Sequence, residues 1–169
     1  MRIGLDFDNT IVSYDALFHR VALENGHIPA DLPVSKNAVR DHLRAQDKEH
    51  LWTEMQGHVY GARMQEAAMF PNAPEVIAQL RDAGHALFII SHKTRRPYLG
   101  PAYDLHGAAQ EWIAAHLPLI PESSVFFHEK KEEKIGRIRS LACEAFLDDL
   151  PEILLHEAFP PQTKRYLFS

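Results

Sequence analysis

Along most of the chain, short continuous apolar runs alternate with longer segments whose apolar residues recur at helical spacing. Continuous apolar runs of this length are typical of strands that are covered on both faces. Five of them are expected to form strands, at residues 3–5, 86–90, 125–127, 145–147 and 166–168. Three segments between them have the spacing of amphipathic helices, at residues 74–84, 108–117 and 131–142. This alternation predicts an α/β fold built on a doubly wound parallel sheet.

The first of these helices has recognisable signals at both ends. Pro74 fits the first turn of a helix, where a missing N–H is no loss, and Gly84 is a typical stop. Its apolar spacing predicts that Val76, Ile77 and Leu80 face the core.

The stretch between the first and second apolar runs has helical spacing and no strand signal. Ser35 is a good N-cap for one helix there, and another helix is expected from about Lys48. We therefore expect a core of residues 1–12 and 70–169, interrupted by a helical insertion at residues 13–69.

Polar side chains that could take part in catalysis or ligand binding follow three of the expected strands. Asp6 and Asp8 follow the first, Ser91 follows the second, and Asp148 and Asp149 follow the fourth. The carboxyl ends of parallel strands meet at one edge of the sheet, where open α/β sheets bind their ligands. Solvated acids have no reason to follow several separate apolar runs, so this convergence favours a functional site.

The spacing of Asp6 and Asp8 indicates a binding site for a cation. Residues i and i+2 of an extended chain point to the same side, and two adjacent carboxylates repel unless a cation or proton lies between them. Oxygen ligands of this kind suit Mg²⁺. The alternative is a pair of solvated acids at a strand end, where Asp8-Asn9 is ordinary turn chemistry.

Composition narrows the class of protein. The chain has 169 residues, enough for one domain with a small insertion, and its net charge of −5 disfavours a nucleic-acid-binding surface. No apolar span is long enough to cross a membrane, and the first residues do not have the pattern of a signal peptide. The single Cys143 rules out an intramolecular disulfide, fits the reducing cytoplasm, and is expected to be a buried structural thiol.

Asp-Phe-Asp-Asn-Thr at residues 6–10, Ser91 after a second strand, a lysine on a later helix and Asp148-Asp149 together resemble the haloacid dehalogenase-like hydrolase superfamily. The order of these motifs and their spacing on the predicted topology carry the resemblance, which covers the whole chain. It implies a Rossmann-type core, and it makes the helical insertion a small cap between the first and second motifs.

The resemblance also implies roles for individual residues. Asp6 matches a nucleophile that forms an aspartyl-phosphate, and Asp8 matches the general acid/base, which favours phosphatase over dehalogenase chemistry. Ser91 matches the hydroxyl that binds the transferring phosphoryl group. The metal ligands, for Mg²⁺, would be Asp6, Asp8 through its backbone carbonyl, Asp148 and Asp149, and the commoner glycine-aspartate form of the last motif is absent.

Lysines crowd the start of the helix that should carry the motif lysine. Lys134 is our choice, because it precedes Ile135 and the apolar stripe and so lies one turn into the helix. Lys131 is the alternative, and either lysine could instead form a Glu/Lys pair on a solvated helix face. A lysine and a magnesium ion would together offset the repulsion between a carboxylate nucleophile and a phosphate dianion.

The expected substrate is a small soluble phosphate ester, either a sugar phosphate or a nucleotide. We expect the cap and the loop at residues 92–104 to close over it, with His92, Lys93 and Arg95 as substrate contacts beside Ser91. A solvated loop is the commoner explanation for paired arginines such as Arg95 and Arg96. We expect a cytoplasmic monomer or homodimer that binds neither nucleic acid nor membrane.

Three other functions stay open on the sequence. A phosphomutase or phosphotransferase would use the same Asp6 and pass the phosphoryl group to an acceptor other than water. A receiver-type signalling domain also combines acids, a hydroxyl and a lysine. In such a domain, however, the phospho-accepting aspartate follows a central strand, and no helical insertion of roughly fifty residues is expected after the first strand. A non-catalytic phosphate-binding protein is the third, because a fold does not fix a function.

Overall fold

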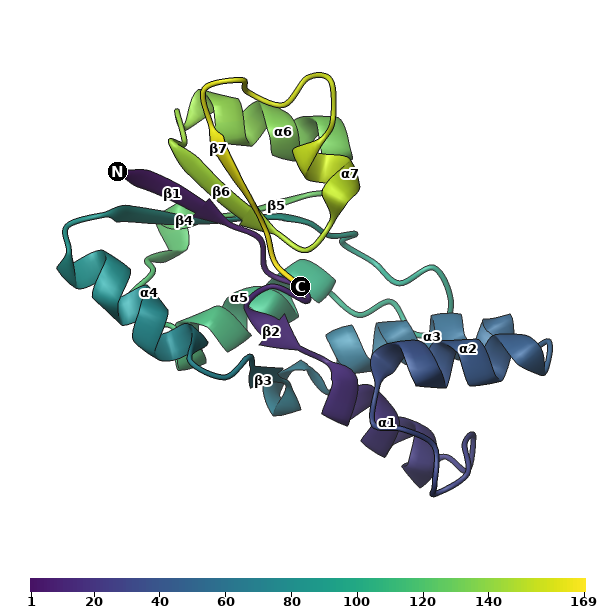
Figure 1. Ribbon diagram of the computed structural model, residues 1–169. Helices are drawn as coiled ribbons and strands as arrows, with labels where there is room; N and C mark the ends of the chain where they lie inside the picture. Colours follow the sequence, from purple (N-terminus) through teal and green to yellow (C-terminus); the bar gives the residue numbers. More distant parts are fainter. The chain divides into compact units, whose positions relative to one another are not determined.

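Five strands form a fully parallel sheet in the order β5-β4-β1-β6-β7 in the computed structural model, which describes residues 1–169 (Figure 1). These strands are β1 (Arg2–Leu5), β4 (Ala86–His92), β5 (Val125–His128), β6 (Ala145–Asp148) and β7 (Lys164–Leu167). Each contains or overlaps one of the five apolar runs. The predicted α/β class with a parallel sheet is therefore confirmed, and so is the edge position of the last strand.

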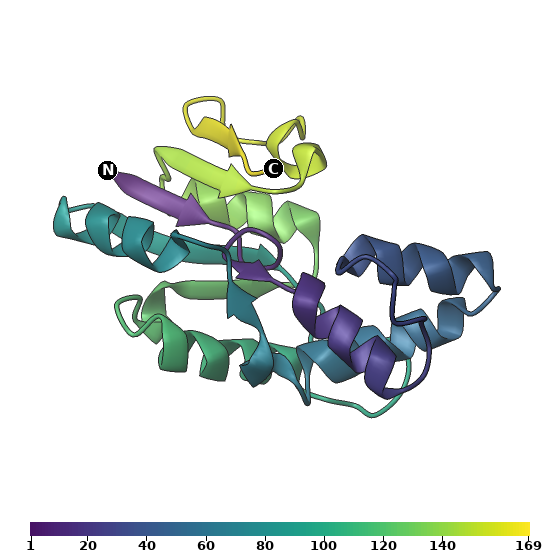
Figure 2. The ribbon, with the colours of Figure 1, turned by 60° about the horizontal axis from the view of Figure 1, so that its bottom comes forward.

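The chain also contains seven α-helices. The α-helices are α1 (Asp15–Glu24), α2 (Lys36–Ala45), α3 (Glu49–Tyr60), α4 (Ala73–Asp82), α5 (Leu105–His116), α6 (Lys131–Ser140) and α7 (Pro151–Leu154). Short 3₁₀ turns are found at Met64–Glu66 and Glu122–Ser124. Helices α6 and α7 lie on one face of the sheet and α4 on the other (Figures 1 and 2). None of the helices combines the length and hydrophobicity that a bilayer crossing requires.

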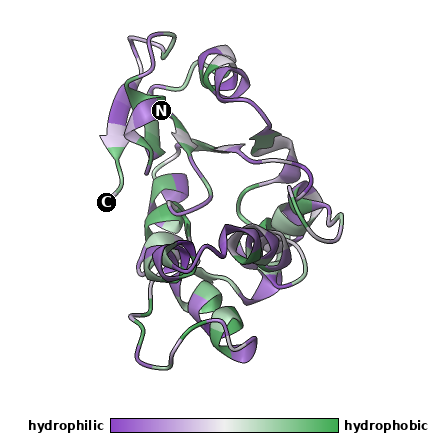
Figure 3. Cartoon of the chain, turned by 90° about the vertical axis from the view of Figure 1, so that its right-hand side faces the viewer, coloured by the Kyte–Doolittle hydropathy of each residue, from purple (hydrophilic) through white to green (hydrophobic).

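One hydrophobic cluster fills the space between the sheet and helices α6 and α7. Ile90 and Phe146 from the sheet pack with Ile138 from α6 and Ile153 from α7, and all four are buried. Gly4 allows this close packing, because a Cβ at its position would lie 2.5 Å from Cδ2 of Phe146. The buried apolar residues of α6 and α7 therefore face the sheet. The helices in Figure 3 carry both hydrophobic and hydrophilic residues.

The chain forms two compact units. The first comprises residues 1–12, 69–94 and 113–169, and the second comprises residues 13–68 and 95–112. The second unit thus contains all but the last residue of the segment expected as a helical insertion, together with residues 95–112. The division of the chain into a core and an inserted cap stays a prediction.

Aromatic packing holds the second unit together internally. Phe18 on α1 contacts the rings of Tyr14, Trp52 and Tyr60, with centroids 4.8 to 6.3 Å apart. The Lys36 ammonium lies 5.6 Å from the ring centre of Phe18 and donates a hydrogen bond to the Tyr60 hydroxyl at 2.8 Å. Helices α1, α2 and α3 are thereby joined through one cluster.

The structure corrects some local expectations. Val76 is 48 % exposed rather than inward-facing, whereas Ile77 beside it is buried. Two short strands, β2 (Val12–Ser13) and β3 (Ala68–Met69), pair in a separate sheet that was not predicted, because two residues carry no periodic signal. Helix α5 begins three residues earlier than expected, since the Asp104 carboxylate accepts the Gly107 N–H at 3.2 Å and caps it.

Candidate active site

Three neighbouring strands bring the predicted polar residues to one edge of the sheet. Strand β1 lies between β4 and β6, so Asp6 lies between Ser91 on β4 and Asp148 at the end of β6. A cavity of about 130 Å³ opens there, within the first unit. Its lining consists of Asp6, Asp8, Asn9, Ser91, His92, Lys134, Asp149 and Leu150.

A tight turn after β1 shapes one wall of this cavity. The Phe7 carbonyl oxygen accepts the N–H groups of Ile11 at 3.0 Å and Val12 at 3.1 Å. Asn9 adopts a left-handed backbone with φ of 62°, which asparagine tolerates better than most residues. The turn returns the Thr10 hydroxyl to Asp6, where it donates to Oδ2 at 3.2 Å and lies 3.5 Å from Oδ1 of Asp149.

Lys134 is the central cation of the site. Its Nζ lies 2.7 Å from Oδ1 of Asp6 and 2.6 Å from Oδ2 of Asp148, and the residue has no exposed surface. Its helix α6 starts close to the carboxyl end of β5, so a residue one turn in reaches the carboxylates. Lys131, the alternative, instead pairs with Glu152 at 2.8 Å and is 37 % exposed at the side chain. Of the two lysines, only Lys134 contacts Asp6.

The buried ion cluster is short of positive charge. Burial raises the pKa of Asp6 to about 7, against the opposing influence of Lys134, and the negative charge of Asp148 adds to the rise. Burial also acts to lower the pKa of Lys134, but the charges of Asp6 and Asp148 outweigh it and hold that pKa above its usual range. Lys134 therefore stays protonated, and one ammonium group serves two carboxylates.

Asp148 and Asp149 have different surroundings. Both oxygens of Asp148 are engaged, Oδ2 by Lys134 and Oδ1 by the Leu150 N–H at 2.9 Å, and its side chain is fully buried. Asp149 is only half-buried and lines the cavity. One carboxylate oxygen from each of Asp6, Asp148 and Asp149 lies within 4.8 Å of the others, which is close enough for a shared cation.

A second ion pair holds Asp8. The Lys93 ammonium lies 3.1 Å from Oδ1 and 2.9 Å from Oδ2 of Asp8, and Lys93 is only 5 % exposed. The Lys93 N–H donates to the His128 carbonyl at 2.8 Å, so the backbone after β4 directs this side chain toward Asp8. The sequence predicted Lys93 as a substrate contact and gave no indication of this pairing with Asp8, and the substrate contact stays a prediction.

Ser91 has a buried hydroxyl without a hydrogen-bond partner. The residue is 1 % exposed and lines the cavity beside Asp6. Buried polar groups are almost always paired, so this hydroxyl is available to hydrogen-bond a group that enters the cavity. His92 also lines the cavity, with its Nε2 donating to the Glu129 carbonyl at 3.1 Å.

Arg95 is not among the residues that line this cavity. It belongs to the second unit, where its guanidinium pairs with Asp104 at 3.8 Å and the side chain is 57 % exposed. Its neighbour Arg96 donates to the Ala102 carbonyl at 2.8 Å. The substrate-binding role of Arg95 stays a prediction.

The sequence predicted most of the residues that line the cavity as site residues, but it gave no role to Thr10. The signal was available, because Thr10 closes the motif at residues 6–10 and a turn there would bring its side chain back to the first aspartate.

Sequence comparison finds distant relatives. No family model matches the chain. Two bacterial proteins that bear the name "Putative nucleotidase" match 91 % of this chain and 79 % of their own length. The protein from Bacillus cereus is 24 % identical and the one from Oceanobacillus iheyensis is 25 % identical.

Solved structures match over nearly the whole chain. A haloacid dehalogenase-superfamily hydrolase from Ehrlichia chaffeensis aligns with a TM-score of 0.56 at 12 % identity, covering 98 % of this chain and 90 % of that one. A predicted phosphoglycolate phosphatase from Haemophilus somnus aligns with a TM-score of 0.55 at 16 % identity, covering 99 % and 88 %. The resemblance inferred from the motifs is confirmed: the chain has the fold of the haloacid dehalogenase-like superfamily.

Proposed function

We propose that this protein is a magnesium-dependent phosphatase that hydrolyses a small phosphomonoester through an aspartyl-phosphate on Asp6. The observation that carries this proposal is the contact of Asp6 with the Lys134 ammonium, beside the unpaired Ser91 hydroxyl in one cavity. A carboxylate nucleophile, a fixed cation and a free hydroxyl donor are the groups that transfer of a phosphoryl group requires.

The proposed reaction has two displacements. In the first, a carboxylate oxygen of Asp6 attacks phosphorus while the bond to the ester oxygen breaks, and that oxygen leaves with a proton from Asp8. In the second, water attacks the aspartyl-phosphate, Asp8 accepts the proton of that water, and inorganic phosphate and the Asp6 carboxylate are released. Lys134 and Ser91 would hold the phosphoryl oxygens during both steps. A positioned acid/base such as Asp8 typically accelerates such steps by about 10²- to 10⁴-fold.

The residues fit a hard divalent cation. Asp6, Asp8, Asp148 and Asp149 gather around two lysines, so the ionised cluster has more negative than positive charge. Magnesium would be held by Asp6, Asp149 and the Asp8 carbonyl, and when bound it would supply positive charge that offsets the repulsion between carboxylate and phosphate. Asp149 is our choice over Asp148 for direct contact, because Lys134 and the Leu150 N–H already engage both oxygens of Asp148.

We infer that the substrate is a nucleoside monophosphate rather than a sugar phosphate. The names of the two relatives favour a nucleotide. The cavity of about 130 Å³ suits a phosphoryl group and is too small for a nucleoside, so the alcohol portion of the substrate would extend beyond it.

The test is phosphate release from nucleoside monophosphates, sugar phosphates and an aryl phosphate, with and without magnesium. Asp6→Asn should abolish turnover, because an amide is not a nucleophile here. Asp82→Asn is the matched control and should keep turnover, because the Asp82 side chain is exposed at the end of α4. Turnover that survives in Asp6→Asn contradicts the mechanism. Phosphoryl transfer to an added alcohol in place of water would instead identify a phosphotransferase.

A comparison of the two final acids tests the metal assignment. Asp149→Asn should raise the magnesium concentration for half-maximal turnover by about tenfold or more with little loss of stability, since it removes a ligand that is half-exposed. Asp148→Asn should mainly destabilise the fold, since it weakens the buried contact with Lys134. The opposite pattern, with the magnesium requirement changed only by Asp148→Asn, would reverse the assignment.

A further inference from the structure

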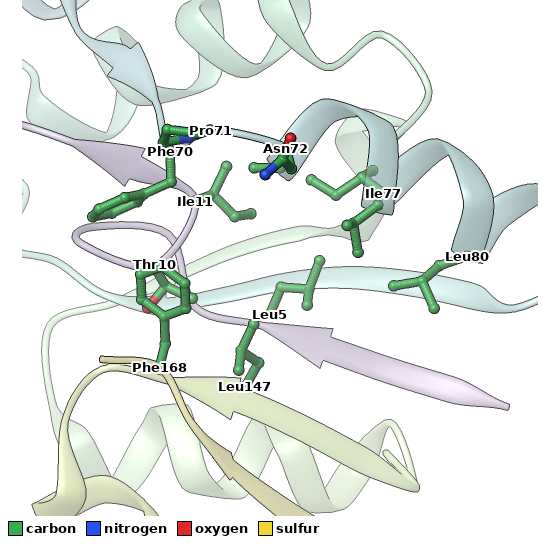
Figure 4. A pocket seen from close by; sticks show the side chains of 12 residues that line it. Leu5, Thr10, Ile11, Phe70, Pro71, Asn72, Ile77, Leu80, Leu147 and Phe168 are labelled. Atoms are coloured by element: carbon green, nitrogen blue, oxygen red, sulfur yellow. The ribbon is translucent and has the colours of Figure 1, made fainter.

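A second cavity lies within the first unit and is almost wholly apolar. Its volume is about 180 Å³, larger than that of the carboxylate cavity. It is lined by Leu5, Thr10, Ile11, Phe70, Pro71, Asn72, Ala73, Val76, Ile77, Leu80, Leu147 and Phe168. Figure 4 shows these side chains around one space, with Phe70 and Phe168 at one end and Leu80 at the other. No charged side chain lines it, so a bound molecule would be neutral.

This pocket and the carboxylate site are lined by neighbouring residues of the same strand ends. Leu5 and Leu147 immediately precede Asp6 and Asp148, and successive side chains of a strand point to opposite faces. Leucines and aspartates thus belong to opposite faces of the same strand ends. Thr10 connects the two sides, because it lines the apolar pocket while its hydroxyl donates to Asp6 at 3.2 Å.

We propose that this pocket is a regulatory site for a small, neutral aromatic molecule about the size of indole, and the regulatory part rests on the proposed phosphatase function. A cavity of about 150 Å³ lined by Leu, Ile and Phe is known to hold benzene, so this larger pocket has room for a bicyclic ring. The Phe70 and Phe168 rings meet edge to face, with centroids 4.8 Å apart, and a third ring extends that packing. A molecule that displaces Thr10 changes its contact with Asp6.

Val76 provides a variant that fills the pocket without disturbing the core. It lines the pocket yet is 48 % exposed, so Val76→Trp should place an indole ring across the opening. Gln79 lies on the same helix, is exposed and does not line the pocket, so Gln79→Trp is the matched control. Titration of indole into ¹⁵N-labelled protein, followed by amide chemical shifts, measures binding without any need for turnover.

Wild type and Gln79→Trp should bind indole with a Kd of about 0.1–1 mM, and Val76→Trp should bind it at least about tenfold more weakly. Saturating indole should change the turnover of a nucleoside monophosphate by about twofold or more in wild type and leave Val76→Trp unchanged. Absence of saturable binding, or equal binding by Val76→Trp, overturns the site. Binding with unaltered turnover overturns the regulation. If no ester is hydrolysed even without indole, the proposed function fails and the regulatory part with it, while the shifts still decide the binding site.

Discussion

Replacement of Lys134 by methionine tests the electrostatic core of the site. The Lys134 ammonium lies within 2.7 Å of both Asp6 and Asp148, and all three residues are buried. Methionine has a similar length and no charge, so the variant keeps the packing and removes the only cation that touches both carboxylates.

The expected loss of stability is large for one residue. Removing one partner of a buried ion pair typically destabilises a protein by about 3–5 kcal/mol, because the remaining charge is left without compensation. We expect Lys134→Met to fall in this range near neutral pH, out of a total stability of about 5–15 kcal/mol. Lys131→Met is the matched control on the same helix. Because Lys131 pairs with Glu152 in solvent, that change should cost about 0–1 kcal/mol.

The loss of stability in Lys134→Met should increase with pH. In the wild type, burial raises the pKa of Asp6 from 3.8 to about 7, so the folded state binds this proton more tightly than the unfolded state. Stability attributable to Asp6 is therefore present at low pH and is lost as pH rises from about 4 to 7. Lys134 lowers the pKa of Asp6, so its removal extends this window upward. The difference between Lys134→Met and wild type should thus grow as pH rises.

Urea denaturation followed by far-UV circular dichroism at several pH values measures these differences. Fluorescence gives a second signal, because both tryptophans, Trp52 and Trp112, are buried in the second unit, whereas Lys134 lies in the first. A loss for Lys134→Met no greater than that for Lys131→Met would refute the reasoning, and so would a loss that shrinks as pH rises.

Two further predictions concern the core of the first unit. Gly4→Ala should destabilise the protein by about 1–3 kcal/mol, since the new Cβ would lie 2.5 Å from buried Phe146, whereas Gly136→Ala, with open space around it in α6, should be neutral or stabilising. Equal midpoints in urea for the two variants would contradict this. Burial raises the pKa of Cys143 to about 11, so native protein at pH 8 should react with a thiol reagent only as fast as it unfolds. Labelling at the rate of a free thiol would show that Cys143 is accessible.

The local hydrophobic pattern was sufficient to predict the strands of the sheet and the positions of the motif residues at their ends. The inner strands β1, β4 and β6 are largely buried, so each reads as an apolar run, and the run at 86–90 indeed forms β4. The edge strand β7 is exposed along its length. The polar residues that follow these runs had to meet at one edge, because parallel strands share the direction of their carboxyl ends. The convergence of Asp6, Ser91 and Asp148 was therefore predictable from the chain alone.

Side-chain pairing was not predictable in the same way. The sequence left Lys131 and Lys134 as alternatives, and only the packing of α6 against the sheet brings Lys134 to Asp6 while Lys131 pairs with Glu152. The pairing of Lys93 with Asp8 likewise depends on backbone contacts between β4 and the end of β5.

Sequence by itself determined the fold class and the edge of the sheet at which the site forms, because these follow from hydrophobic periodicity and strand direction. The central position of the first strand in the sheet came from the tertiary structure. Tertiary structure decided which cation neutralises which carboxylate and which of two adjacent acids faces the cavity. It also created the apolar pocket behind Asp6, which is lined by residues from β1, the turn after it, the stretch at 70–80, β6 and the end of the chain. Such features depend on packing between distant residues, and no local pattern encodes the distances involved.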